Sequence, residues 1–204
     1  DLAAVPISGE VLPNELGEII GEYPGVAVYS AVIESEAIIR GNGVTQICSV
    51  LGVDAQYGDV SQIDSAIVEG IWGRSFENSQ CVCLGYGIRS EMGIRSDSTY
   101  PPLMSLGAPV RGKKLSRHRE RAFRTLPALA CGTFSINADL DTRYILAPLE
   151  FARELFDRPN EVSRFEIQVD EGVSAARLAT DANFIAALGD NVHLRTREEK
   201  HTLL

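Results

Sequence analysis

The apolar positions at the start of the chain predict a strand, a helix and a hairpin, in that order. Residues 2–7 have strand character, and apolar residues then recur at helical spacing over 12–23, with Pro13 in the first turn. Two branched apolar runs, 26–39 and 45–53, follow and are joined by the turn sequence RGNG. A glycine-containing turn between two such runs is typical of a β-hairpin.

The middle of the chain is predicted to be rich in strands. A capping pattern predicts that residues 61–72 form a helix. Beyond it, three apolar runs at 103–110, 126–134 and 143–149 have strand character. A helix over 148–156 begins at one proline and stops before another.

The C-terminal third predicts a strand, a helix and a returning strand. Residues 163–169 alternate as a strand does, and a helix over 175–188 is capped by Ser174 and ended by Gly189. Residues 192–196 form the returning strand. The chain therefore has α/β ends around a β-rich centre, which indicates the α+β class with one domain inserted into another.

We expect a discontinuous domain at 1–57 and 160–204 and an inserted domain at 58–159. A length of 204 residues is enough for one domain or two small ones. No run approaches the roughly 18 to 20 apolar residues that cross a bilayer, and the N-terminus lacks a signal pattern. Because the sequence starts at Asp1, we expect a mature protein or an excised piece.

Positive charge is concentrated in one segment. Residues 111–124 hold seven of the 19 basic residues and one acidic residue, Glu120, so they carry +6 and leave −15 for the remainder of a chain whose net charge is −9. An acidic body argues against a general nucleic-acid binder, because affinity for phosphates comes from lysine and arginine. The basic segment is still a candidate for a local contact.

Motifs for catalysis or ligand binding are weak. Cys81 and Cys83 lack the second ligand pair of a zinc site, and the GYG sequence that follows lacks the third glycine of a dinucleotide loop. The NADLD sequence at 137–141 lacks the glycine and the glutamate of a calcium loop, so we expect a solvated turn. No serine elbow or Cys/His pairing stands out. We therefore expect no catalytic residue, no cofactor and no metal.

The four cysteines, Cys48, Cys81, Cys83 and Cys131, each lie among apolar residues. They are too few for a disulfide scaffold in a chain of this length. We expect buried free thiols, with one disulfide as the alternative.

Six phrases, in their order along the chain, resemble the extracytoplasmic domain of an ABC-transporter permease. They are the stretch from YPGVAVYS to AQYGDV, then IVEGIW, CVCLGYGIRSEMGI, LACGTF, LDTRYILAPLEFARELF and VSRFEIQV. The series is similar to the lipoprotein-releasing LolC/LolE type, within the wider group that shares the MacB-like periplasmic core domain. It covers nearly the whole chain, and no single phrase is specific.

This resemblance implies a bipartite fold on the periplasmic side of the cell inner membrane. The chain ends would form a porter-like α/β subdomain and the middle a β-rich subdomain called Sabre. Cys81 and Cys83 would be core residues of a strand ending in Leu-Gly, and a short helix would lie between Gly85 and Gly93. The parent would be a multi-pass protein, and this chain the soluble fragment between its first and second membrane helices.

The resemblance also implies a transport function without catalysis in this domain. A separate cytoplasmic ATP-binding subunit would hydrolyse ATP, and a pair of permeases would transmit that motion to release lipoproteins from the inner membrane to a periplasmic chaperone. A Sabre loop that contacts the chaperone matches Pro109–Thr125. The candidate partner-binding residues are Arg111, Lys113, Lys114, Arg117, Arg119, Arg121 and Arg124.

Other interpretations stay open. The basic segment lacks the proline and apolar residues of a rigid hook, so it is either a solvated loop or a salt-sensitive contact for a chaperone or an anionic headgroup. The parent is alternatively an efflux or mechanotransmission permease that works with a periplasmic adaptor. A secreted hydrolase or thiol enzyme and a free-standing binding module are the remaining alternatives.

Overall fold

The computed structural model describes residues 2–9, 11–72, 80–94, 100–109 and 123–196. The contacts within the chain divide it into two compact units. The first unit holds the described residues within 1–32, 54–62 and 160–204, and the second holds those within 33–53 and 63–159. The α+β class predicted from the sequence is confirmed, because both units combine strands with helices.

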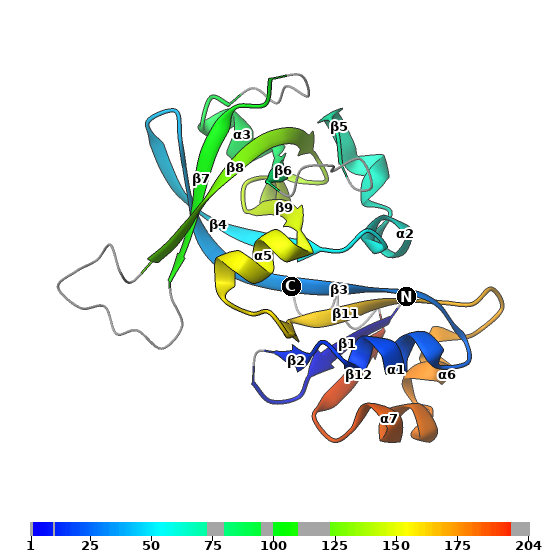
Figure 1. Cartoon of the computed structure of the whole chain (residues 1–204). Coiled ribbons are helices and arrows are strands. Elements are labelled where there is room, and N and C mark those ends of the chain that lie inside the picture. The colour runs from blue at the N-terminus through cyan, green and yellow to red at the C-terminus, as the bar shows by residue number, and fades with distance from the viewer. Residues whose placement is uncertain (1, 10, 73–79, 95–99, 110–122, 197–204) are drawn as a thin grey trace. The chain divides into compact units, whose positions relative to one another are not determined.

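The first unit is a four-stranded sheet with short helices. Its strands lie in the order β12-β1-β11-β3, and β1 is antiparallel to both β11 and β12. Helices α6 and α7 contact β12, and α1 contacts α7 (Figure 1). The elements are β1 (Leu2–Pro6), β2 (Leu12–Pro13), α1 (Leu16–Glu22), the first part of β3 (Val26–Gly41), α2 (Tyr57–Ser61), β10 (Glu161–Val162), β11 (Arg164–Val169), α6 (Ala175–Ala179), α7 (Ala182–Leu188) and β12 (Val192–Thr196).

The helix predicted over 12–23 is shorter than expected, and the prediction for Pro13 is wrong. Leu12 and Pro13 form β2, which pairs with Val162 and Glu161 of β10. Leu12 is fully buried there, so it is held by strand pairing before α1 begins. The periodicity missed this because a single buried leucine fits a helical spacing and a short strand equally well.

The helix predicted over 175–188 is divided into α6 and α7. Ser174 caps the first helix as predicted, because its side chain accepts a hydrogen bond from the N–H of Arg177. Asp181 starts the second, since its side chain accepts from the N–H groups of Asn183 and Phe184. The predicted strand-helix-strand path is correct, and β1 lies between the two parallel strands β11 and β12.

The second unit is a mixed sheet with helices beside it. Its strands lie in the order β3-β4-β9-β6-β8-β5, and β7 pairs with both β3 and β8. The elements are the second part of β3, β4 (Val44–Val53), the 3-10 helix η1 (Ile63–Ala66), β5 (Ile67–Gly70), β6 (Cys81–Gly85), α3 (Tyr86–Glu91), β7 (Leu103–Pro109), β8 (Phe123–Phe134), α4 (Ala138–Asp141), β9 (Tyr144–Pro148) and α5 (Leu149–Phe156).

The predicted hairpin is formed by β3 and β4, and its turn explains why the strands reverse there. Asn42 and Gly43 have φ angles of 50° and 78°. Positive φ at both central residues is the requirement of a type I′ turn, for which Asn-Gly is a preferred pair. The strands predicted at 103–110, 126–134 and 143–149 and the helix over 148–156 are confirmed as β7, β8, β9 and α5.

The helix predicted over 61–72 is wrong. Helix α2 ends at Ser61, and Gln62 follows in the left-handed conformation with φ of 57°. A 3-10 turn comes next, and Ile67–Gly70 is strand β5, which pairs with β8. The pairing partner is remote in sequence, and β-branched Ile67 and Val68 suit a strand.

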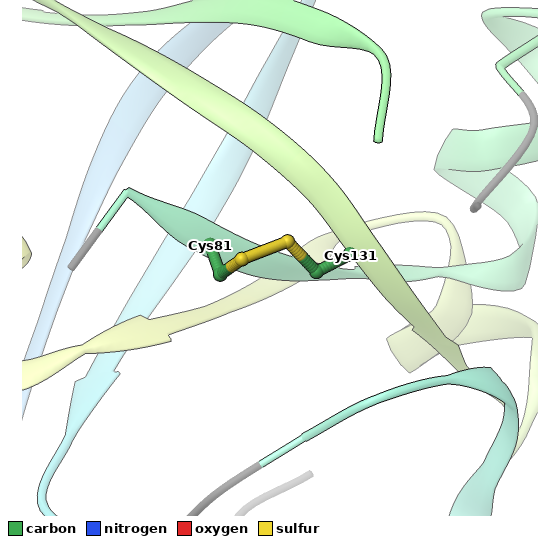
Figure 2. The surroundings of a disulfide bond; sticks show 2 residues. All are labelled: Cys81 and Cys131. Carbon is green, nitrogen blue, oxygen red and sulfur yellow. A yellow bond between two sulfur atoms is a disulfide. The ribbon is translucent and has the colours of Figure 1, made fainter. Parts of the chain in front are cut away.

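The expectation of four free thiols is wrong for two of them. Cys81 of β6 and Cys131 of β8 form a disulfide with a Cα–Cα distance of 5.4 Å (Figure 2). The β6–β8 register moves from Val82↔Ala130 to Cys83↔Gly132, so Cys131 is an inserted residue in β8. Such a bulge changes the direction of a side chain, which places Cys131 against Cys81.

The division into units differs from the predicted boundaries in two places. Residues 33–53, predicted to belong with the chain ends, are grouped with the middle, and residues 58–62, predicted to belong with the middle, are grouped with the ends. The long strand β3 therefore contributes to both units. The assignment of the units as porter-like and Sabre-like subdomains stays a prediction.

Candidate functional surface at the β7–β8 hairpin

The β7–β8 hairpin is a firmly paired framework on either side of the basic segment. The strands pair from Leu103↔Leu129 to Pro109↔Phe123, and β7 also pairs with β3 through Gly107↔Ile38. Apolar residues on one face are buried: Met104, Leu106, Ala108, Ala128 and Ala130. Figure 1 shows this hairpin as a long two-stranded ribbon. Both strands that flank the segment are thus held by hydrogen bonds and by core packing.

Of the seven predicted partner-binding residues, one lies among the described residues and six lie outside them. Arg111, Lys113, Lys114, Arg117, Arg119 and Arg121 lie outside the described residues. Arg124 is described, and it lies in β8, opposite Ala108 of β7. The seven residues therefore share a stretch of sequence, and Arg124 alone among them has described contacts.

Arg124 joins β8 to the C-terminus of α5. Its Nη1 donates to the carbonyl oxygen of Glu154 at 2.6 Å, and its Nη2 lies 3.1 Å from Oδ1 of Asp157. Asp157 ends α5 in the left-handed conformation with φ of 57°. A cation at a helix C-terminus satisfies free carbonyls and interacts favourably with the helix dipole. The guanidinium of Arg124 therefore already has partners within its own unit.

Exposed apolar side chains accompany β7 at its other end. Leu103, the first residue of β7, is 69% exposed, and Tyr100 just before it is 82% exposed. The sequence pattern indicates neither residue as exposed. Alternation along a strand indicates which positions share a face, but it does not indicate which face is covered by another element.

The cysteine thiols that remain free are poor nucleophiles. Cys48 and Cys83 are both buried. Burial raises the pKa of each thiol from 9.0 to about 12. Since the thiolate is the reactive form, almost all of each thiol is unreactive near neutral pH.

The NADLD sequence forms a short capped helix. The side chain of Asn137 accepts from the N–H of Leu140, and Asp141 accepts from the hydroxyl of Ser135 and the N–H of Ile136. These oxygens therefore stabilise the turn between β8 and β9. Within the described ranges, no group of three or more His, Cys, Asp or Glu side chains is arranged to hold a metal ion.

Comparison with solved structures finds folds similar to this one. The periplasmic region of MacB from Actinobacillus actinomycetemcomitans has a TM-score of 0.69 and 10% sequence identity, with 99% of this chain and 91% of that one covered. The extracellular domain of the noncanonic ABC-type transporter YknZ from Gram-positive bacteria has a TM-score of 0.69 and 9% identity, with 96% and 100% covered. The chain has the fold of these transporter domains.

A third solved structure, a domain of a candidate permease protein from Porphyromonas gingivalis, has a TM-score of 0.51 and 15% identity and covers 100% of this chain. Comparison with family models finds no match, and comparison with curated protein sequences finds none. The MacB-like fold implied by the sequence phrases is thus confirmed. Among the described helices, none has the length and apolar character of a membrane span.

Proposed function

We propose that this chain is the extracytoplasmic domain of an ABC-transporter permease, on the periplasmic side of the cell inner membrane. The observation that carries the proposal is that nearly the whole chain aligns with nearly the whole of each transporter domain. The match to the periplasmic region of MacB includes 99% of this chain and 91% of that one, and the match to the YknZ domain is equally complete. A whole-domain correspondence supports a shared role more strongly than a shared supersecondary motif would, although fold alone does not specify function.

The finer proposal is lipoprotein release, and it rests on the six sequence phrases similar to the LolC/LolE type. In this proposal a cytoplasmic ATP-binding subunit hydrolyses ATP, two permease copies transmit the motion, and this domain performs no catalysis. The basic segment between β7 and β8 contacts a periplasmic lipoprotein chaperone. The pairing of β7 with β3 and the contact of Arg124 with α5 support this placement, because both flanks of the segment are held.

The disulfide supports an oxidising location. Cys81 and Cys131 lie in adjacent strands, and both are buried in the core. Disulfides persist in the periplasm and outside the cell, whereas cytosolic thiols are kept reduced. A periplasmic domain of an inner-membrane protein is consistent with this chemistry.

Chemical cross-linking of the 204-residue chain in periplasmic extract, followed by mass spectrometry, tests the finer proposal. We expect a lipoprotein chaperone to be captured at low salt, less of it at high salt, and little by a variant with Arg117, Arg119 and Arg121 changed to Glu. A matched control changes Arg40, Arg177 and Arg195 to Glu, which alters the net charge equally outside the segment. Equal capture of the chaperone by both variants would contradict the role of the basic segment.

An efflux or mechanotransmission permease is the second candidate, and the fold match to the periplasmic region of MacB favours it as much as the first. The same experiment separates the two candidates. Capture of a periplasmic adaptor protein, with no lipoprotein chaperone, would favour the second candidate and contradict lipoprotein release. The extracytoplasmic assignment would stand in both cases.

A further inference from the structure

The first part of β3 has a strand partner on one edge. Residues Val26–Val32 pair with β11, antiparallel, from Val26↔Val169 to Val32↔Arg164. The other edge of β3 pairs with β4, which follows β3 through the Asn42-Gly43 turn, and in a hairpin closed there the ten residues of β4 reach back to about Val32. Strand β7 pairs with the same edge as β11 but farther along β3, as Ile38↔Gly107 shows. Among the described residues, no strand therefore pairs with the second edge of β3 near Tyr29.

Asp54 follows the last residue of β4, and its side chain is hydrogen-bonded to β3 next to the part of the edge that β4 covers. Its Oδ2 accepts from the N–H of Ala31 at 2.7 Å, and its Oδ1 accepts from the hydroxyl of Ser30 at 2.6 Å and from the N–H of Gln56 at 3.1 Å. The N–H of Ala31 therefore points away from β11. Because backbone groups alternate in direction along a strand, the N–H and C=O of Tyr29 point to the same open edge.

A cavity of about 270 Å³ lies along the open edge. It is lined by four consecutive strand residues, Val26–Tyr29, together with Gly21, Asp54 and Gln56. This volume is slightly below the roughly 300–1,000 Å³ of ordinary ligand pockets, so it suits one long side chain better than a complete drug-sized ligand. The lining thus combines free backbone groups with a recess for a side chain.

The wall of the cavity is held in place by close packing. The ring of Tyr29 lies against α1, since a Cβ on Gly21 would be 2.6 Å from Tyr29 Cε1 and one on Gly17 would be 2.9 Å from Cε2. The ring of Tyr29 also meets that of Phe165 edge-on, with ring centroids 6.0 Å apart. A glycine pair and an aromatic contact therefore fix the strand and the helix that border the cavity.

The charge beside the cavity is negative. Asp54 has no ion-pair partner among the described residues, and its carboxylate borders the recess. Burial, and after it the carboxylates of Asp54 and Glu18, raise the pKa of the Tyr29 hydroxyl above its usual value. A ligand that carries a lysine or arginine side chain would therefore be favoured over an acidic one.

We propose that the open edge of β3 binds an extended, basic peptide segment of a partner protein. The segment adds a strand beside Val26–Tyr29, its backbone bonds to the N–H and C=O of Tyr29, and its lysine or arginine side chain enters the recess beside Asp54. Main-chain hydrogen bonds supply affinity in this mode of recognition, and the side-chain recess supplies specificity. The proposal goes beyond permease membership and does not depend on the identity of the transported substrate.

The probe is the blocked peptide acetyl-Thr-Val-Lys-Val-Thr-amide, titrated into the 15N-labelled 204-residue chain. We expect the backbone signals of Val26–Tyr29 to shift and amide exchange at Tyr29 to slow. Replacing the probe lysine with glutamate should weaken binding by about tenfold or more. In an extended peptide only every second backbone N–H faces β3. N-methylation of the peptide bonds whose N–H faces β3 should weaken binding by about tenfold, because those N–H groups form the hydrogen bonds between the strands. N-methylation of the other peptide bonds should change the affinity by less than about threefold.

A chain variant provides the second measurement. Gln56 is exposed, so Gln56→Lys should leave the thermal unfolding midpoint unchanged. Because Gln56 also lines the cavity, the added positive charge should weaken binding of the lysine-containing peptide by about tenfold. The matched control is Ala186→Lys, an exposed position on α7. Shifts away from β3, equal binding of both methylated probes, or equal effects of the two chain variants would overturn the proposal. So would concentration-dependent dimerisation that protects Tyr29 without peptide, because the occupant would then be a second copy.

Discussion

Removing the disulfide should lower the free energy of unfolding of the second unit by an amount that follows from the sequence separation of the two cysteines. Cys81 and Cys131 are separated by 50 residues, so the bond closes a long loop in the unfolded chain. The chain-entropy relation for a loop of that length gives a destabilisation of about 4 kcal/mol when the bond is lost. Experimental losses for native disulfides are typically about 2–5 kcal/mol, so we expect a large fraction of the stability of an ordinary domain to disappear.

Urea unfolding followed by circular dichroism measures this loss. The Cys131→Ala variant should unfold at a lower urea concentration than the oxidised protein, and reductant should lower the midpoint of the oxidised protein but not that of the variant. The matched control is Cys48→Ala, which removes a buried free thiol. It should cost about 1 kcal/mol from lost packing and should keep its sensitivity to reductant.

Thiol counting gives the result that would refute this reasoning. Unfolded in denaturant without reductant, the protein should show two titratable thiols, from Cys48 and Cys83, and four after reduction. Four thiols before reduction would show that the four-thiol expectation from sequence was right and that the strands are not cross-linked. An unfolding midpoint that does not respond to reductant would refute the predicted magnitude.

Three further outcomes are expected. Gly52→Ala should destabilise the protein by about 1–3 kcal/mol or more in urea unfolding, because the added Cβ overlaps that of Ala152 on α5; an unchanged midpoint would contradict this packing. Arg124→Gln should cost about 0.5–1 kcal/mol in the same assay, since its ion pair is partly exposed, and an unchanged midpoint would show that the contact of Arg124 with α5 does not stabilise the fold. Between pH 9 and about 12 the free energy of unfolding should fall, because the thiols of Cys48 and Cys83 ionise first in the unfolded chain; a variant with alanine at both positions should fall less.

Local chemistry explains which parts of the fold the sequence predicts well. The Asn-Gly turn, the helix that begins after Pro148 and the strand ending at Gly85 each combine a clear apolar period with a residue suited to the boundary. Helix α3 follows Gly85 and ends before Gly93, whose φ is 59°, as the resemblance implies. These elements need no information about a remote partner.

The errors occur where a remote partner decides the structure. Leu12 belongs to β2 because Val162 lies opposite it, and Ile67 belongs to β5 because Phe134 lies opposite it. The disulfide depends on one inserted residue in β8, which changes the direction of Cys131. A window of ten residues contains none of these partners, so its periodicity suggests the more local alternative, a helix or a free thiol.

Charge counting grouped seven basic residues into one candidate site, and the contacts of the last member show why such a group needs subdivision. Arg124 is bound to the end of α5 through a carbonyl oxygen and the carboxylate of Asp157. A guanidinium that is already paired must give up those contacts before it binds a partner, and that loss reduces the affinity gained. In the proposed contact, Arg124 therefore holds the beginning of β8 against α5, and the basic residues that precede Arg124 bind the partner.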